Sequence, residues 1–166
     1  MKTFLPSFEN QEERQLKGLQ WTVNQAYNGS AAYSEKFDAL NLKPNDIQSL
    51  EDLKLLPFSS AEDLAKGYPF PLLSVPIQDV VRIHTSSGTT GKRKVLCYTQ
   101  KDIEDWTHFF ARCFEMAGLT AEDRVQIAVG YGPWTAGIGF QTACETFGAM
   151  SLPVGPGNIE TQIDFL

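Results

Sequence analysis

One short stretch of the sequence combines the residue types that bind phosphate groups. Residues 85–92 read Thr-Ser-Ser-Gly-Thr-Thr-Gly-Lys, so hydroxyl side chains alternate with glycines and end in a lysine. Glycines let the backbone turn tightly with its N–H groups exposed, and successive N–H groups in such a turn hold an anion. The hydroxyls add neutral donors and can reach a metal-bound water, and Lys92 brings positive charge. We predict that this loop binds nucleotide phosphates. The residues predicted to do so are Ser86, Ser87, Gly88, Thr89, Thr90, Gly91 and Lys92.

The loop departs from two well-known nucleotide-binding patterns. A Walker A loop has four residues between its first glycine and Gly-Lys, followed by Ser or Thr. Here two residues separate Gly88 from Gly91, and Arg93 follows the lysine. The glycine pairs at 130/132 and 137/139 lack the third glycine of a dinucleotide fingerprint. From composition alone, a hairpin turn rich in Ser, Thr and Gly is the alternative interpretation.

The remaining reactive residue types indicate neither a metal site nor a nucleic-acid surface. The three cysteines are odd in number and far apart, which favours ordinary reduced thiols over a disulfide framework. His84 and His108 are too far apart in sequence to form a local ligand pair. The net charge of −6 disfavours a nucleic-acid partner, although residues 92–94 form a local basic cluster. We therefore predict no metal site built from this chain alone.

The first 70 residues read as short helices. Apolar residues at helical spacing between Leu16 and Tyr27 predict the first helix, which Asn28-Gly29 ends. Ser30 is placed to cap a second helix, and Ser60-x-x-Asp63 has the capping-box spacing of a further helical turn. The apolar residues expected on the core face of the second helix are Tyr33, Phe37 and Leu40.

After a proline-rich connector at 68–76, the pattern changes to alternating strands and helices. Strands are predicted at 80–85 and 95–98, on either side of the glycine-rich loop, and then at 124–129 and 151–154. Helices are predicted to follow a cap at Thr99 and end at Gly118, to run from Gly137 to Met150, and to start near Asn158. This order predicts parallel βαβ units and an α/β fold class. We expect residues 1–78 to form a helical segment with its connector, and residues 79–166 to form the first part of an α/β domain.

The apolar stretches are too short to span a bilayer, and no apolar run follows the basic residue near the N-terminus. From the sequence we therefore expect no membrane span, no secretory signal and a cytoplasmic location.

Residues 86–92 resemble the phosphate loop of adenylate-forming enzymes, the superfamily of acyl-CoA synthetases, peptide-synthetase adenylation domains and luciferases. The flanking sequence is similar to one branch, the phenylacetate–CoA ligases, from about residue 16 onward. The resemblance implies the start of the βαβ-type subdomain of an adenylate-forming enzyme, preceded by a helical leader. The segments that carry it are Tyr33-Ser34-Glu35-Lys36-Phe37, Leu50-Glu51-Asp52-Leu53, Leu56-Pro57-Phe58, Arg82-Ile83-His84, Tyr98-Thr99, Gly130-Tyr131-Gly132 and Gly137-x-Gly139.

The resemblance also implies a two-step reaction. A carboxylate attacks the α-phosphate of ATP to give an acyl adenylate and pyrophosphate, and coenzyme A then displaces AMP. The loop would hold the β- and γ-phosphates, with Thr89 and Thr90 as hydroxyl contacts and Lys92 as the charge. ATP, Mg²⁺ and coenzyme A are the implied cofactors, and an aryl carboxylic acid resembling phenylacetate is the implied substrate. Matched position by position, the acid pocket falls on Tyr131, Gly132, Trp134, Thr135 and Gly137.

Trp134 and Val129 bear on the acid pocket, and Arg93-Lys94 bears on the phosphate loop. Trp134 falls where the family places an aromatic in the acid pocket, but a core tryptophan that anchors the start of a helix is the alternative. The family's usual Pro-Thr after Gly-Lys is Arg93-Lys94 here, which adds charge at the loop exit. Val129 stands two residues before Tyr131, where the family tends to have an aromatic residue.

Family members run to several hundred residues, and the resemblance places their adenine- and ribose-binding motifs and their adenylation lysine beyond the position of Leu166. We therefore expect the chain to be inactive alone, and to self-associate or pair with a C-terminal half. A truncated gene product, a fragment and one half of a split enzyme would each fit. The alternative functions are an amide-forming or cofactor-adenylylating relative, and a non-catalytic phosphate-binding or interaction module.

Overall fold

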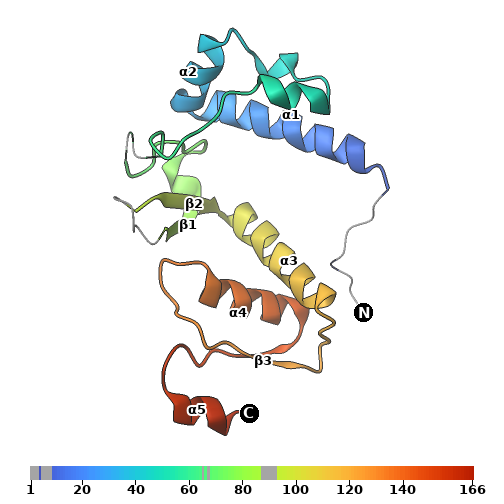
Figure 1. The fold of residues 1–166 in the computed structure, drawn as a ribbon, viewed down its shortest axis with the longest axis vertical. Coiled ribbons are helices and arrows are strands. Elements are labelled where there is room, and N and C mark those ends of the chain that lie inside the picture. Colours follow the sequence, from blue (N-terminus) through green and yellow to red (C-terminus); the bar gives the residue numbers. More distant parts are fainter. Residues whose placement is uncertain (1–3, 5–8, 65, 67, 87–92) are drawn as a thin grey trace. The chain divides into compact units, whose positions relative to one another are not determined.

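The computed structural model describes residue 4 and residues 9–64, 66, 68–86 and 93–166 (Figure 1). These residues belong to two compact units. The helical unit comprises Ser7–Val80, and the α/β unit comprises Val81–Leu166 together with Met1–Pro6, of which Phe4 is described.

The helical unit contains two α-helices and three short 3-10 segments. The two predicted helices are confirmed as α1 (Gln11–Gly29) and α2 (Ala31–Ala39). Ser30 between them is buried, and its carbonyl accepts hydrogen bonds from the backbone N–H groups of Tyr33 and Ser34. The 3-10 segments are η1 (Pro44–Asp46), η2 (Leu50–Leu55) and η3 (Ile77–Asp79).

The core of this unit lies between α1, α2 and the segment that follows them. Its buried residues are Val23, Phe37, Leu42 and Ile47, and half-buried Leu19, Tyr27, Tyr33 and Leu56 pack against them. The prediction that Leu40 contributes to the core is wrong, because α2 ends at Ala39 and the side chain of Leu40 is 55% exposed. The chain turns through a left-handed residue at Asn41, and Leu42 enters the core instead.

The residues after η2 are held against α2 by polar contacts. Lys36 on α2 donates to the Asp63 carboxylate at 2.7 Å and to the Phe58 carbonyl at 2.8 Å. The hydrogen bond from Lys36, with those from Ser60, lowers the pKa of Asp63 to about 2. Ser60 and Asp63 exchange the hydrogen bonds of a capping box, as their spacing predicts, but residues 61–64 form a turn rather than a helix.

The connector is also fixed to the end of α1, at a single carbonyl group. The side-chain amide of Gln25 donates to the carbonyl oxygen of Ser74 at 2.6 Å. Gly29 lies against the same peptide group, because a Cβ atom at this position would overlap the oxygen and stand 2.7 Å from the carbonyl carbon. The connector therefore requires glycine as the last residue of α1.

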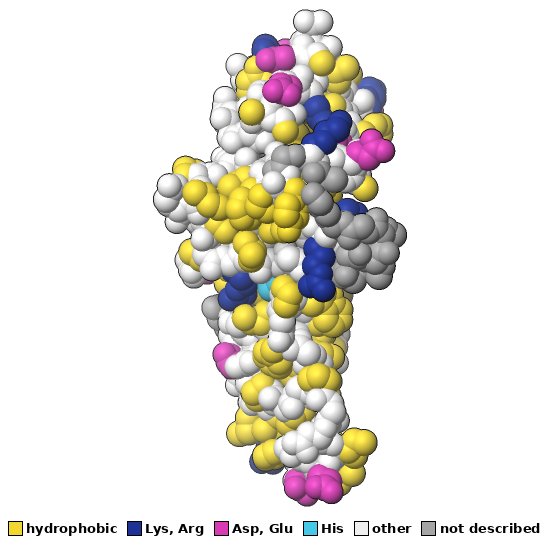
Figure 2. Space-filling model, turned by 90° about the vertical axis from the view of Figure 1, so that its left-hand side faces the viewer, with side chains coloured by type: hydrophobic (Ala, Val, Ile, Leu, Met, Phe, Trp, Pro, Cys, Tyr) yellow, Lys and Arg dark blue, Asp and Glu magenta, His cyan; other side chains and the backbone are white. Residues whose placement is uncertain are grey.

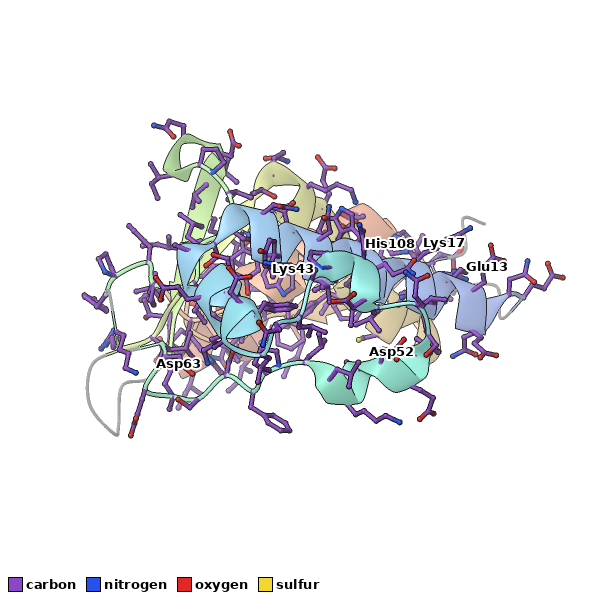
Figure 3. All side chains as sticks on the ribbon, turned by 90° about the horizontal axis from the view of Figure 1, so that it is seen from above. Glu13, Lys17, Lys43, Asp52, Asp63 and His108 are labelled. Carbon is purple, nitrogen blue, oxygen red and sulfur yellow. The ribbon has the colours of Figure 1, made fainter. Side chains whose placement is uncertain are left out.

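The outer face of α1 carries charged side chains that stabilise the helix little. Glu13 and Lys17, one turn apart, lie near each other in Figure 3 and form an ion pair at 2.6 Å. Both side chains are well exposed, and solvent-exposed ion pairs of this kind stabilise a helix only weakly.

The α/β unit has strands and helices in the predicted order. The strands are β1 (Val80–Thr85), β2 (Val95–Thr99), β3 (Arg124–Gln126) and β4 (Met150–Leu152). The helices are α3 (Gln100–Met116), α4 (Ala136–Phe147) and α5 (Ile159–Asp164). Thr99 and Asp102 form the predicted capping box of α3, and Gly118 after its end has a φ of 83°.

Only one of the predicted parallel units forms among these elements. β3 and β4 pair in parallel, Val125 opposite Ser151, and α4 connects them in a βαβ arrangement. β2 does not join this sheet, because it pairs with β1 in a separate two-stranded sheet. The expected βαβ unit formed by β2, α3 and β3 is therefore wrong.

The core of the α/β unit lies between α3 and α4. Ala111, Ala143 and Cys144 are fully buried there. A chain of ring contacts runs along the two helices from Trp106 to Phe110 and on to Phe140, with centroid distances of 5.1 and 5.6 Å. The aromatic side chains on this side of α3 therefore pack against α4.

Phe4 is part of this core, although it precedes the helical unit in sequence. The centroid of its ring lies 5.3 Å from that of His108 and 5.8 Å from that of Phe147. The residue is only 2% exposed. Its backbone N–H donates to the Glu115 carboxylate at 2.6 Å, and its carbonyl accepts from Arg112 at 2.8 Å. The start of the chain is thus tied to α3 and α4.

Candidate functional site

The two ends of the glycine-rich loop are joined by two hydrogen bonds. The backbone N–H of Ser86 donates to the carbonyl of Lys94 at 3.0 Å, and the backbone N–H of Lys94 donates to the Ser86 hydroxyl at 3.0 Å. Ser86 is the one predicted phosphate-binding residue that the structure describes, and residues 87–92 lie outside the described residues. The loop between β1 and β2 is therefore closed at its base.

The predicted acid-binding segment, residues 131–137, follows β3 and extends into the first turn of α4. In an α/β sheet this is the carboxyl end of a strand, where ligands commonly bind. The carbonyl of Pro133 accepts a hydrogen bond from the backbone N–H of Thr85 at 2.8 Å. It also contacts Nδ1 of His84 at 3.1 Å. The two predicted binding segments thus meet at one carbonyl group, at the point where the loop begins.

Two aromatic side chains of this segment are open to solvent. Trp134 is 58% exposed, so it is not the core residue that the alternative interpretation required. Tyr131 is 42% exposed, and burial, together with the charge of Glu145, raises the pKa of its hydroxyl above the usual value. Like any tyrosine hydroxyl, it is protonated at neutral pH and can donate a hydrogen bond. That these rings line an acid pocket stays a prediction.

Gly137 has a packing role in this segment. The residue is buried in the first turn of α4, and a Cβ atom there would lie 2.5 Å from the Gly130 carbonyl oxygen and 3.0 Å from the Tyr131 ring. Gly132 is different, because a Cβ atom there would meet nothing within 4 Å. Thr135 is the N-cap residue of α4, but its side chain makes no capping hydrogen bond.

We expect Gly137→Ala to destabilise the α/β unit by about 1–3 kcal/mol, because the methyl group would displace either α4 or the backbone of Gly130. Gly132→Ala is the matched control, since the same methyl group enters open space. The free energies of unfolding from urea titrations give the comparison. Equal free energies for the two variants would contradict the packing role.

The structure adds His84 to the candidate site as a residue that sequence reasoning did not select. Exposure alternates along β1, so Arg82 and His84 point inward while Val81 and Ile83 point outward. His84 is 3% exposed, and its ring lies 5.2 Å from that of Tyr98. Strand alternation could have indicated its burial, but nothing in the sequence indicates its contact with a backbone carbonyl 49 residues away.

The thiols do not enter this site. Cys97, Cys113 and Cys144 are free, and burial raises the pKa of the Cys97 and Cys144 thiols. Within the described ranges, no three His, Cys, Asp or Glu side chains are grouped so that they could hold a metal ion. No helix in the described part of the chain is long and apolar enough to cross a membrane.

The fold matches crystal structures of CoA ligases. A structure of 2-hydroxyisobutyryl-CoA ligase with 2-HIB-AMP aligns with a TM-score of 0.81 at 20% identity, over 98% of this chain and 39% of that one. A second structure of that ligase, with 2-HIB-AMP and CoA, aligns with a TM-score of 0.81 at 23% identity. The alignment covers 96% of this chain and 35% of that one. The chain therefore has the fold of the part of an adenylate-forming CoA ligase that it aligns with.

Sequence comparison identifies the family within that fold. Phenylacetate-coenzyme A ligase of Escherichia coli (strain K12) is 39% identical over 96% of this chain and 37% of its own length. The enzymes of the same name from Aromatoleum evansii and Pseudomonas putida are 42% and 38% identical, over 92% and 93% of this chain. Nearly the whole chain is therefore homologous to one part of the phenylacetate–coenzyme A ligases. It spans about a third of the length of these curated relatives. No protein-family model matches the chain.

Proposed function

We propose that the chain forms the N-terminal part of an ATP-dependent aryl acid–CoA ligase, which makes an acyl adenylate and then an acyl-CoA. The loop of residues 86–92 would bind the β- and γ-phosphates of ATP, and residues 131–137 would bind the acid. The observation that carries this proposal is the pair of contacts from His84 and Thr85 to the Pro133 carbonyl, which bring the two segments together. The names of the curated relatives support the choice of substrate.

This arrangement suits the first half-reaction. The acid carboxylate must approach the α-phosphate closely and in line with the departing pyrophosphate, so the relative position of the two binding segments affects the rate. Negative charge develops on the phosphates during the attack, and Lys92 together with the loop hydroxyls would stabilise it. Mg²⁺, when bound, would neutralise phosphate charge, and the loop hydroxyls are the candidates for contacting its bound water.

The exposed rings of Trp134 and Tyr131 favour an aryl acid over an aliphatic one. An aromatic substrate can stack on or pack edge-on against such rings, which contributes about 0.5–1.5 kcal/mol beyond the area buried. Gly132 leaves open space beside them, because nothing lies within 4 Å of where its Cβ atom would be.

The partner we propose is the remaining part of such a ligase on the same or another polypeptide, or a second copy of this chain. Many apolar side chains of the α/β unit are exposed, and the lower part of the molecule in Figure 2 shows hydrophobic side chains interspersed with polar surface. Large exposed apolar areas usually contact another protein surface. The exposed residues include Val81, Ile83, Leu96, Met150, Ile159, Ile163 and Phe165. We also propose a cytoplasmic location, where ATP and coenzyme A are available.

We expect the pure 166-residue chain to release no pyrophosphate from ATP, Mg²⁺ and phenylacetate, and a polypeptide that also contains the C-terminal two-thirds of a ligase of this family to release it. The measurement is a coupled pyrophosphate assay, with an aliphatic acid of similar size as the control substrate. Sustained turnover by the pure chain would contradict the expected dependence on a partner. Failure of the complete polypeptide to turn over any aryl acid would overturn the proposed ligase function.

A further inference from the structure

His84 lies near the end of β1, two residues before Ser86, where the glycine-rich loop starts. Its ring packs edge-on against Tyr98 of β2, with 5.2 Å between the ring centroids. The centroid of the Trp106 ring on α3 lies 5.7 Å away. These two rings leave the imidazole little room to turn. Arg82, two residues earlier on the same strand, also lies over the Trp106 ring at 5.7 Å. The imidazole is therefore held in one orientation by packing.

The contact with Pro133 defines which nitrogen of His84 carries the proton. A carbonyl oxygen can only accept, so Nδ1 at 3.1 Å from it must be the donor. In the neutral ring Nε2 is then an acceptor. Nε2 is buried and has no hydrogen-bond partner among the described residues. An unpaired buried polar atom destabilises a fold, so a purely structural role would be served as well by an apolar residue.

We propose that His84 is a positioning residue, which fixes the acid-binding segment to the start of the phosphate loop through the Pro133 carbonyl. This inference rests on the proposed function, because it assigns the loop to phosphate and residues 131–137 to the acid. His84 and Thr85 both donate to Pro133, and the next residue, Ser86, begins the loop. A shift of Ser86 when phosphate binds would therefore reach Pro133 and its neighbour Trp134 through these two donors.

Two substitutions separate the donor function from the size and polarity of the side chain. The amide nitrogen of Asn can occupy the place of Nδ1, whereas the longer Gln places its amide near the position of Nε2. His84→Asn should therefore keep the hydrogen bond to Pro133, and His84→Gln should lose it. Thr85 keeps its own hydrogen bond in both variants, so the coupling should be weakened in His84→Gln rather than abolished.

The experiment uses the 166-residue chain labelled with 5-fluorotryptophan, with its three fluorine resonances assigned by single Trp→Phe substitutions. Tripolyphosphate is the probe for the loop, and calorimetry measures its binding separately. We expect saturating tripolyphosphate to shift the Trp134 resonance in the unsubstituted chain and in His84→Asn. In His84→Gln the shift should fall to roughly half, because one of two donors remains. Trp21, in the helical unit, is the internal reference.

Each outcome decides between the proposals. Equal Trp134 shifts in all three chains, or calorimetric binding without any Trp134 shift, would overturn the role of His84 and leave the phosphate site intact. If no saturable binding occurred, the proposed phosphate site and the inference would both fall. The histidine tautomer of the unsubstituted chain, read from long-range nitrogen–proton spectra, is a further test should neither variant fold. Protonation on Nε2 alone would overturn the inference.

Discussion

Lys92→Ala is expected to slow acyl-adenylate formation roughly tenfold to a thousandfold in a polypeptide that contains this chain and the rest of the ligase. Removing one positioned charge from the site of developing phosphate charge typically costs a few kcal/mol of transition-state stabilisation. Thioester formation from a supplied acyl adenylate should be nearly unchanged, because pyrophosphate has already left. The two half-reactions are measured separately, by pyrophosphate release and by loss of free thiol.

Arg93→Ala is the control for this substitution. Arg93 is the adjacent residue and is exposed, and the family resemblance assigns it no phosphate contact. We expect its effect on adenylation to be much smaller than that of Lys92→Ala. Equal losses in both half-reactions would indicate a folding defect, and an unchanged rate in Lys92→Ala would leave the loop as a turn without a role in binding.

The second large effect is expected in the helical unit, where Gly29→Ala should lower the free energy of unfolding by about 3 kcal/mol. This value is at the upper end of the usual destabilisation caused by overpacking. The new methyl group would overlap the Ser74 carbonyl, and a backbone group cannot rotate away as a side chain can. The same movement would break the hydrogen bond from Gln25 to that carbonyl. Urea titrations followed by circular dichroism measure the change.

Gly18→Ala, in the same helix, is expected to change the free energy of unfolding in the opposite direction. Gly18 lies inside α1, and nothing stands within 4 Å of where its Cβ atom would be. Alanine loses less backbone freedom on folding, so this substitution should stabilise the chain by about 0.5–1 kcal/mol. If both variants were stabilised, the contact between Gly29 and Ser74 would not exist in solution.

The sequence predicted local structure well and the pairing of strands only in part. The capping box at Thr99 and Asp102 and the end of α3 at Gly118 depend on residues a few positions apart, and both are confirmed. Strand partners depend on tertiary contacts. Alternation along β1 predicts a strand, but it does not indicate that β2 pairs with β1 rather than with β3.

In the candidate site, too, the sequence predicted the local segments but not the tertiary contact between them. Spacing and residue type identified the loop and residues 131–137, but the contact that joins them uses the backbone carbonyl of Pro133, which no side-chain pattern can indicate. The glycine at 137 was predicted as part of the acid pocket. The structure gives it a steric reason, the close approach of α4 to Gly130, which depends on packing that only the folded chain defines.

The position of Phe4 constrains the order in which the chain folds during its synthesis. Phe4 is synthesised before its partners, because Glu115 is 111 residues further along the chain and Phe147 is later still. All of residues 7–80 must therefore be synthesised before Phe4 can reach its place between α3 and α4. Contacts of such high sequence separation form slowly, since the intervening chain must first be confined. The local contacts of the helical unit can form on the emerging chain, whereas the docking of Phe4 can be completed only after the ribosome has passed α4.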